Sequence, residues 1–129
     1  FDCDFVICDK TREKANEVKS VQVIGEVKDR DVIIIDDLID TGGTIAMSSK
    51  VLMEKGAKSV RAIITHPVLS GNAEENLNNS ALTELVVTDS IPLKFRNKRI
   101  KVLSIAGLIA KAIRKIHDNE STSSLFINR

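Results

Sequence analysis

The sequence predicts an α/β fold in which a mainly parallel sheet is covered by helices. Short β-branched runs alternate with helix-length segments that have a 3.6-residue apolar period, which is the pattern of successive β-α units. Several strand segments are apolar at consecutive positions, as expected for strands buried under helices on both faces. At 129 residues, the chain has the length of one domain or of part of one.

The strands are expected where β-branched residues cluster between polar or glycine-containing segments. Two of them precede the most distinctive motif of the chain, one leads into it, and the others alternate with helices. The expected strands cover residues 4–8, 21–27, 32–36, 60–65, 85–88 and 101–104.

The helices are expected between the later strands. The first should run from residue 43 or 44 to residue 55, with Gly56 as its left-handed C-terminal cap. A shorter helix is expected at 72–79. The clearest helix covers 105–116, where apolar residues recur at i, i+3 and i+4 and Ser104 is placed to cap the N-terminus.

One segment departs from this alternation. From residue 9 to 20 the sequence DKTREKANEVKS is dominated by charged and polar residues and has no apolar period. We therefore expect a mobile surface loop between the first two strands. Taken alone, such a segment is most often a solvated charged turn.

The composition narrows the classes of partner. Apolar residues make up 43% of the chain and charged residues 29%, as in soluble globular proteins, and the formal net charge is +1. This balance favours neither a nucleic acid nor a membrane as partner. No apolar run approaches the length of a transmembrane helix.

The cysteines indicate the cellular compartment, and the first residue suggests that the chain is part of a longer protein. Cys3 and Cys8 have no second pair and no nearby histidine, so we expect two reduced core thiols in a cytoplasmic protein. The chain starts with Phe1 rather than methionine, and we therefore treat it as part of a larger protein.

The motif VIIIDDLIDTGGTI, at residues 32–45, predicts a ligand loop. A buried parallel strand brings Asp36 and Asp37 to the carboxyl edge of the sheet, where open α/β folds bind their ligands. The following turn leads into a helix, whose free N–H groups and dipole attract an anion. Carboxylates instead bind hydroxyl groups or a magnesium ion.

The glycines and threonines complete this loop. Gly42 and Gly43 let the backbone approach a phosphate closely, and the hydroxyls of Thr41 and Thr44 can donate to its oxygens. A sugar phosphate would satisfy both the acids and this cradle. The plainer alternative is that Asp40 or Thr41 merely caps the helix while the other acids face solvent.

Residues 34–44 resemble the phosphoribosyl-pyrophosphate (PRPP) loop shared by type I phosphoribosyltransferases and PRPP synthetases, also called ribose-phosphate pyrophosphokinases. The remainder of the chain resembles the C-terminal half of the PRPP synthetases along nearly its whole length. The similar blocks are DKTREKANEV (9–18), VIGEVKDRDVIIIDD (23–37), ITHPVLSGNA (64–73), VVTDSIP (86–92) and ESTSSLF (120–126).

The resemblance implies a domain organisation. The fold would be α/β, a type I phosphoribosyltransferase-like three-layer fold with a central, mainly parallel sheet. Residues 1–129 would form the C-terminal domain of a PRPP synthetase whose N-terminal domain is absent here. Within it, residues 9–20 would be the flexible catalytic loop and residues 36–44 the ribose 5-phosphate loop.

The resemblance also implies an activity. The family transfers the diphosphoryl group of ATP to O1 of ribose 5-phosphate, giving PRPP and AMP in the presence of Mg²⁺. Lys10 and Arg12 match the catalytic basic pair, and Arg12 would also contact substrate. Such cations stabilise the charge of the group in transfer. The remaining substrate-binding positions would be Asp36, Asp37, Asp40, Thr41, Gly42, Gly43 and Thr44.

The family's metal-binding histidine lies in the absent domain, so we assign no metal ligand to this chain. His66 and His117 are interpreted as a hydrogen-bonded turn residue and a cation at a helix C-terminus, without a catalytic role.

The C-terminal tail has two interpretations. Ser121, Thr122, Ser123 and Phe126 resemble a segment that binds phosphate or an inhibitory nucleotide at a subunit interface in regulated family members. The alternative is a polar connection before an apolar anchor. The resemblance further implies a homo-oligomer, a hexamer built of dimers.

Other functions remain open at this point. A phosphoribosyltransferase would use the same loop, although the chain contains few aromatic residues to stack on a base. A non-catalytic PRPP-synthetase-associated regulatory protein and a plain oligomerising module are further alternatives. We expect the isolated chain to be inactive.

Overall fold

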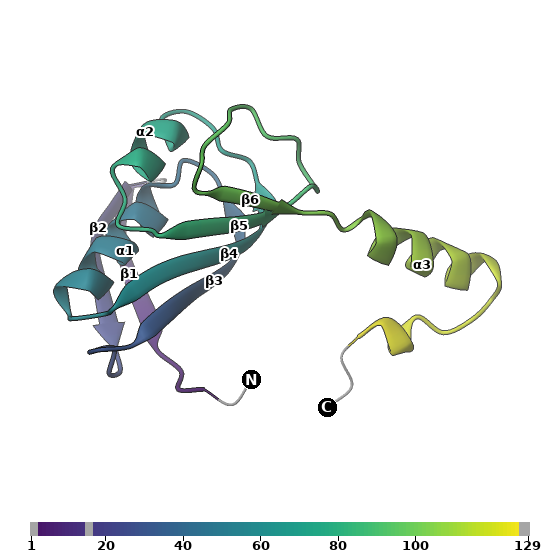
Figure 1. The fold of residues 1–129 in the computed structure, drawn as a ribbon, viewed down its shortest axis with the longest axis horizontal. Helices are drawn as coiled ribbons and strands as arrows, with labels where there is room; N and C mark the ends of the chain where they lie inside the picture. The colour runs from purple at the N-terminus through teal and green to yellow at the C-terminus, as the bar shows by residue number, and fades with distance from the viewer. Residues whose placement is uncertain (1–2, 15–16, 127–129) are drawn as a thin grey trace.

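The protein is described here by a computed structural model, which covers residues 3–14 and 17–126; the side chains of residues 9–20 lie outside the description. A hairpin precedes an alternation of strands and helices (Figure 1). The strands are β1 (Ile7–Lys14), β2 (Glu17–Ile24), β3 (Asp31–Ile39), β4 (Ser59–Pro67), β5 (Glu84–Thr88) and β6 (Ile100–Leu103). The helices are α1 (Gly43–Glu54), α2 (Ala73–Asn78), α3 (Ala106–His117) and the short 3₁₀ helix η1 (Ser123–Leu125).

The central sheet has four parallel strands in the order β3-β4-β5-β6. β3 and β4 are joined through α1, and β4 and β5 through α2, because parallel strands need a crossover connection. β5 and β6 are joined by residues 89–99, which contain no helix. In the β3–β4 pair, Asp36 lies opposite Ile64 and Leu38 lies opposite His66. The carboxyl ends of these two strands therefore lie side by side at one edge.

The segment predicted as a loop at residues 9–20 is part of a hairpin. β1 and β2 pair antiparallel, with irregular register between Thr11 and Lys14. The prediction of a loop between two strands was therefore wrong for residues 9–14 and 17–20, which belong to β1 and β2. The polarity of residues 9–20 does not exclude a strand, because a strand forms its hydrogen bonds with a partner strand that the local sequence does not reveal.

The main core lies on one face of the sheet. Val60, Ala62 and Ile64 of β4 are buried with Leu52 of α1, and Leu77 of α2 belongs to the same cluster. The hairpin contributes Val23 to this cluster, and β2 packs against α1. Helix α1 therefore contacts both the central sheet and the hairpin.

The opposite face of the sheet is not covered by a helix among the described residues. Ile33, Ile35 and Ile63 are 54%, 72% and 43% exposed, respectively. The expectation that these strands are buried on both faces was wrong for this chain. Helix α3 projects away from the sheet beyond β6 (Figure 1) and has no buried residue.

Local signals placed α1 correctly. The helix ends at Glu54, and Gly56 has a φ of 91°, as expected of a left-handed cap. The N–H of Gly56 donates to Met53 O at 2.9 Å, and the N–H of Ala57 donates to Leu52 O at 3.1 Å. These two bonds form a Schellman motif, which satisfies the last carbonyl groups of the helix.

Helix α3 begins close to its expected position. The backbone N–H of Ala106 donates to Ser104 Oγ at 3.3 Å, and that of Ile105 donates to Asp89 Oδ1 at 2.9 Å. Hydrogen bonds from the side chain of Ser104 and the backbone of Ile105 lower the pKa of Asp89 below its usual value. The N-cap of α3 is Ile105, which makes no side-chain cap hydrogen bond, so the prediction of Ser104 as the N-cap was wrong by one residue. The start of α3 is held by Asp89, with a further contact from Ser104.

The first cysteine departs from its prediction. Cys3 is exposed and Cys8 is half-buried, so the expectation of two core thiols was wrong for Cys3. The reason is that β1 begins only at Ile7, after Cys3. Among the described residues, no helix is long and apolar enough to cross a membrane.

Candidate functional site

The acid pair lies in the second half of β3. The strand continues to Ile39, three residues beyond its predicted end, because β4 also continues to Pro67 and pairs with it. Asp36 is half-buried and Asp37 is exposed at this end of the strand. The backbone N–H of Asp37 donates to Asp36 Oδ1 at 3.0 Å.

The turn that follows depends on Gly42. This residue has a φ of 73° in the left-handed region and is the N-cap of α1. Its carbonyl accepts the first bond of the helix, from the N–H of Ala46 at 2.9 Å. A glycine is favoured there because other residues adopt this conformation only with strain.

The plainer interpretation of this loop, a simple side-chain cap, is not supported. Helix α1 has no side-chain hydrogen bond at its cap, and Gly42 occupies that position instead of Asp40 or Thr41. The first N–H groups of a helix have no acceptor within the helix. At the start of α1 they therefore remain available to a ligand such as a phosphate.

Asp40 is held differently from the other two acids. Its carboxylate oxygen Oδ1 accepts a hydrogen bond from the hydroxyl of Ser70. Its backbone carbonyl accepts a second bond from the N–H of Ser70 at 3.1 Å. The side chain of Asp40 thus ties the loop to the turn after β4, whereas the exposed carboxylate of Asp37 can accept hydrogen bonds from hydroxyl groups of a ligand.

His66 in β4 and Ser90, two residues after β5, add polar groups at the same edge. His66 Nδ1 lies 2.9 Å from Ser90 Oγ, and Ser90 Oγ donates to Thr65 O at 3.0 Å. The contact agrees with the prediction that His66 is hydrogen-bonded, but the predicted turn was wrong, because His66 lies within β4 and pairs with Leu38. In the sequence, Ser90 lies two residues after the strand predicted at 85–88 and within the block VVTDSIP, but no role was predicted for it.

The predicted basic pair lies on the hairpin. Lys10 pairs with Val21 and Arg12 with Val18 in the β1–β2 register. Their side chains lie outside the described part of the structure, so the contacts of their charged groups are not described. The catalytic role of Lys10 and Arg12 therefore stays a prediction.

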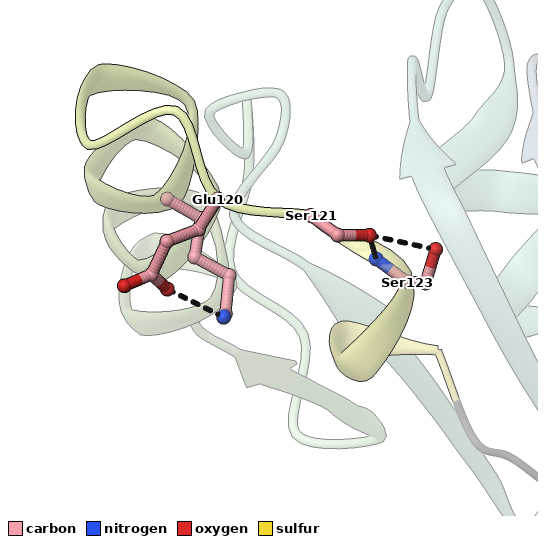
Figure 2. A network of polar contacts seen from close by, with 4 residues as sticks. Glu120, Ser121 and Ser123 are labelled. Carbon is pink, nitrogen blue, oxygen red and sulfur yellow. Dashed lines mark hydrogen bonds and ion pairs between the residues drawn. The ribbon is translucent and has the colours of Figure 1, made fainter.

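The predicted tail residues lie beyond α3, apart from the loop at residues 36–44 (Figure 1). Figure 2 shows the ion pair between Lys115 Nζ and Glu120 Oε2, at 3.0 Å, where α3 leads into the tail. Ser121 Oγ donates to Ser123 Oγ at 3.0 Å and accepts from the Ser123 N–H at 3.2 Å. These serine contacts are local ones. Neighbouring Thr122 is the N-cap of η1, and Phe126 is 72% exposed.

The donor set of the site fits magnesium only in part. In the described portion of the chain, no group of three or more His, Cys, Asp or Glu residues could hold a metal ion. Magnesium, however, is commonly held by one or two carboxylates together with substrate oxygens and water. Asp36 and Asp37 are consecutive residues of β3, so their side chains face opposite sides of the strand, and either one could supply a single carboxylate in that mode of binding.

A family model supplies the decisive comparison. The model described as the phosphoribosyl synthetase-associated domain matches residues 8–127. The chain belongs to this family. The resemblance to the PRPP synthetases is thereby confirmed.

Curated proteins named ribose-phosphate pyrophosphokinase are similar to this chain. The chain is 56% identical over 124 residues to a ribose-phosphate pyrophosphokinase of Campylobacter jejuni, covering 96% of this chain and 40% of that protein. It is 55% identical over 123 residues to the ribose-phosphate pyrophosphokinase of Helicobacter hepaticus, covering 95% of this chain and 40% of that protein. The chain thus spans about 40% of the length of these curated relatives.

A solved structure extends the comparison to the fold. The crystal structure of phosphoribosylpyrophosphate synthetase from Mycobacterium smegmatis is similar with a TM-score of 0.75 and 42% identity. The match covers 80% of this chain and 35% of that one. The predicted fold class, α/β and type I phosphoribosyltransferase-like with a mainly parallel central sheet, is confirmed.

Proposed function

We propose that this chain is the C-terminal domain, residues 1–129, of a ribose-phosphate diphosphokinase. The longer protein would transfer the diphosphoryl group of ATP to O1 of ribose 5-phosphate, giving PRPP and AMP. The observation that carries the proposal is the loop at residues 36–44, in which a left-handed Gly42 joins an acid-bearing strand to a helix N-terminus. The relatives named ribose-phosphate pyrophosphokinase support this reaction over that of a phosphoribosyltransferase.

The loop would bind the two ends of the sugar phosphate differently. The backbone N–H groups at Gly42 and Gly43 and the hydroxyls of Thr41 and Thr44 would hold the 5-phosphate. The carboxylates of Asp36 and Asp37 would accept hydrogen bonds from the ribose hydroxyls. This arrangement would leave O1 of the sugar accessible to the second substrate.

Magnesium would be bound with ATP at the acid end of the site, near Asp36 and Asp37. When bound, the ion neutralises charge on the phosphate oxygens. The residues of this chain would orient the ribose and hold its hydroxyl protons in hydrogen bonds.

Lys10 and Arg12 would act as the catalytic pair on the hairpin, with residues 9–20 as a mobile catalytic segment. An ammonium and a guanidinium placed on the transferred group stabilise its charge more in the transition state than in the ground state. Arg12 can also bind phosphate oxygens in a bidentate manner.

The wider setting of the enzyme belongs to the same proposal. The protein would be cytoplasmic and would assemble into a homo-oligomer, a hexamer of dimers, without nucleic acid or membrane as partner. Ser121, Thr122, Ser123 and Phe126 would contribute to a site for phosphate or an inhibitory nucleotide. The isolated chain would lack the ATP site and be inactive.

The test uses the full-length protein with ATP, ribose 5-phosphate and magnesium, and measures AMP and PRPP. Turnover by the full-length protein and its absence with the isolated chain are expected. Lys10→Ala should lower kcat about 100-fold while ribose 5-phosphate still binds, because this group acts mainly in the transition state. Lys50→Ala removes an exposed charge on α1 and should leave kcat unchanged. Consumption of PRPP with a nucleobase, without AMP formation, would instead indicate a phosphoribosyltransferase.

A further inference from the structure

A glycine-rich loop needs outside support to keep one conformation. Glycine has more backbone freedom than other residues, so Gly42 and Gly43 lose more conformational entropy when they are held in one arrangement. The contacts that hold them come from a segment far along the chain, residues 68–78, which includes the turn after β4 and helix α2. No motif in the sequence predicted a role in the site for any of these residues.

The first contact is made by Asn76, a half-buried residue of α2. Its side-chain Nδ2 donates to Thr41 O at 2.8 Å. The side chain also lies against both glycines: a Cβ built on Gly42 would be 3.7 Å from Asn76 Cβ, and one built on Gly43 would be 3.8 Å from Asn76 Nδ2. The amide of Asn76 thus packs directly beneath the loop.

This hydrogen bond sets the direction of a backbone donor. Thr41 O and the N–H of Gly42 belong to the same peptide unit, and in a planar trans peptide they point in opposite directions. Because Asn76 holds the carbonyl group toward α2, the N–H of Gly42 is directed away from α2. A carbonyl oxygen only accepts, so the nitrogen of the amide, not its oxygen, must face it.

The second contact fixes the residue before Thr41. The turn after β4 donates from Leu69 N to Ile39 O at 3.2 Å and from Ser70 N to Asp40 O at 3.1 Å. The hydroxyl of Ser70 also donates to the carboxylate of Asp40. The end of β3 is therefore already held, and the bond from Asn76 orients the first peptide unit beyond it.

We propose that Asn76 is a positioning residue for the phosphate end of the sugar-phosphate site. Through Thr41 O it orients the N–H of Gly42 before the ligand arrives, so that binding does not have to order the loop. The inference rests on the proposed function, because the ligand is the 5-phosphate of ribose 5-phosphate. Asn76 itself does not act on the reacting atoms.

The experiment is Asn76→Asp in the full-length protein. Aspartate has the shape of asparagine but would face Thr41 O with an oxygen in place of a donor. The KM for ribose 5-phosphate should rise about 10-fold or more, which corresponds to about 1.4 kcal/mol. The KM for ATP should stay within about twofold of wild type, since a single local bond is lost.

Asn78→Asp is the matched control. It makes the same chemical change and adds the same charge, two positions further along α2. Asn78 Oδ1 accepts from Asn97 Nδ2 at 2.9 Å, and an aspartate keeps this acceptor. Both KM values should therefore remain those of the wild type.

The outcomes separate the two proposals. If the wild-type protein does not bind ribose 5-phosphate, the proposed function is wrong. If it binds, and Asn76→Asp and the uncharged variant Asn76→Ser both keep the wild-type KM for this sugar, only the role of Asn76 is wrong. An equal rise in the KM values for ribose 5-phosphate and ATP would show a general structural role and would overturn the inference. Loss of the folded state in both variants, measured by circular dichroism, would do the same.

Discussion

At the scale of single residues, the site depends on the backbone conformation of Gly42. Its φ of 73° lies in the left-handed region, whereas neighbouring Gly43 begins α1 with an ordinary helical conformation. These adjacent glycines of one motif therefore have different roles. The first permits the turn, and the second permits close approach of a ligand to the helix N-terminus.

The two glycines should respond differently to the same substitution. Gly42→Ala should lower the free energy of unfolding by about 1 kcal/mol, because alanine is strained at positive φ. Gly43→Ala should leave it unchanged or raise it by up to about 1 kcal/mol, since alanine favours a helix. The nearest atoms to a Cβ at Gly43 are 3.8 Å away, which leaves room for it. Urea denaturation of both variants measures this, and an equal loss in both would contradict the distinction.

The acids of the motif also differ in their hydrogen-bond partners, which the sequence did not reveal. Asp40 binds the turn after β4 through Ser70, which lies 30 positions further along the chain. Asn76 contacts the loop across 35 positions. The sequence motif indicated a ligand loop because glycines, threonines and acids have local consequences. Its supporting residues could not be predicted, since no local pattern specifies which distant side chain reaches the loop.

At the scale of elements, helices were easier to predict than the hairpin. α1 and its cap at Gly56 follow from apolar periodicity and from the φ that glycine permits, which are both local properties. β1 and β2 instead depend on pairing between two charged segments. A strand has no internal hydrogen bonds, so its partner decides whether it forms.

The start of α3 should be sensitive to acid. The lowered pKa of Asp89 means that its ionised form stabilises the folded state at pH values above the ordinary carboxyl pKa near 4. This stabilisation is lost as the pH falls through the lowered value. Helical circular dichroism of the wild type should therefore decrease below about pH 4 more than that of Asp89→Asn, which has no charge to lose. Identical acid titrations of the two proteins would contradict this role.

At the scale of the whole molecule, apolar surface is left exposed at two places. One is the face of the sheet that carries Ile33, Ile35 and Ile63, and the other is the apolar stripe of α3 that includes Ile113 and Ile116. Continuous apolar patches of this kind are typical of interfaces. The prediction that the strands are apolar on both faces was correct. Among the described residues, however, no helix covers the second face, so the sequence alone could not predict what packs there.

The isolated chain should therefore self-associate. Sedimentation velocity over a range of concentrations should show dimers or larger species, and Ile35→Lys should shift them toward the monomer because it places a charge on the exposed face. Met53→Lys changes an exposed apolar residue of α1 and serves as the control. A chain that stays monomeric at all concentrations would contradict the expectation.

The bonds between the turn at residues 68–72 and the end of β3 also limit how the chain can change in length. Leu69 and Ser70 meet Ile39 and Asp40 in register, so one added residue in this turn would shift every donor past its acceptor. Insertions there should therefore be poorly tolerated. An inserted tag that must leave the protein functional should be placed in another surface turn.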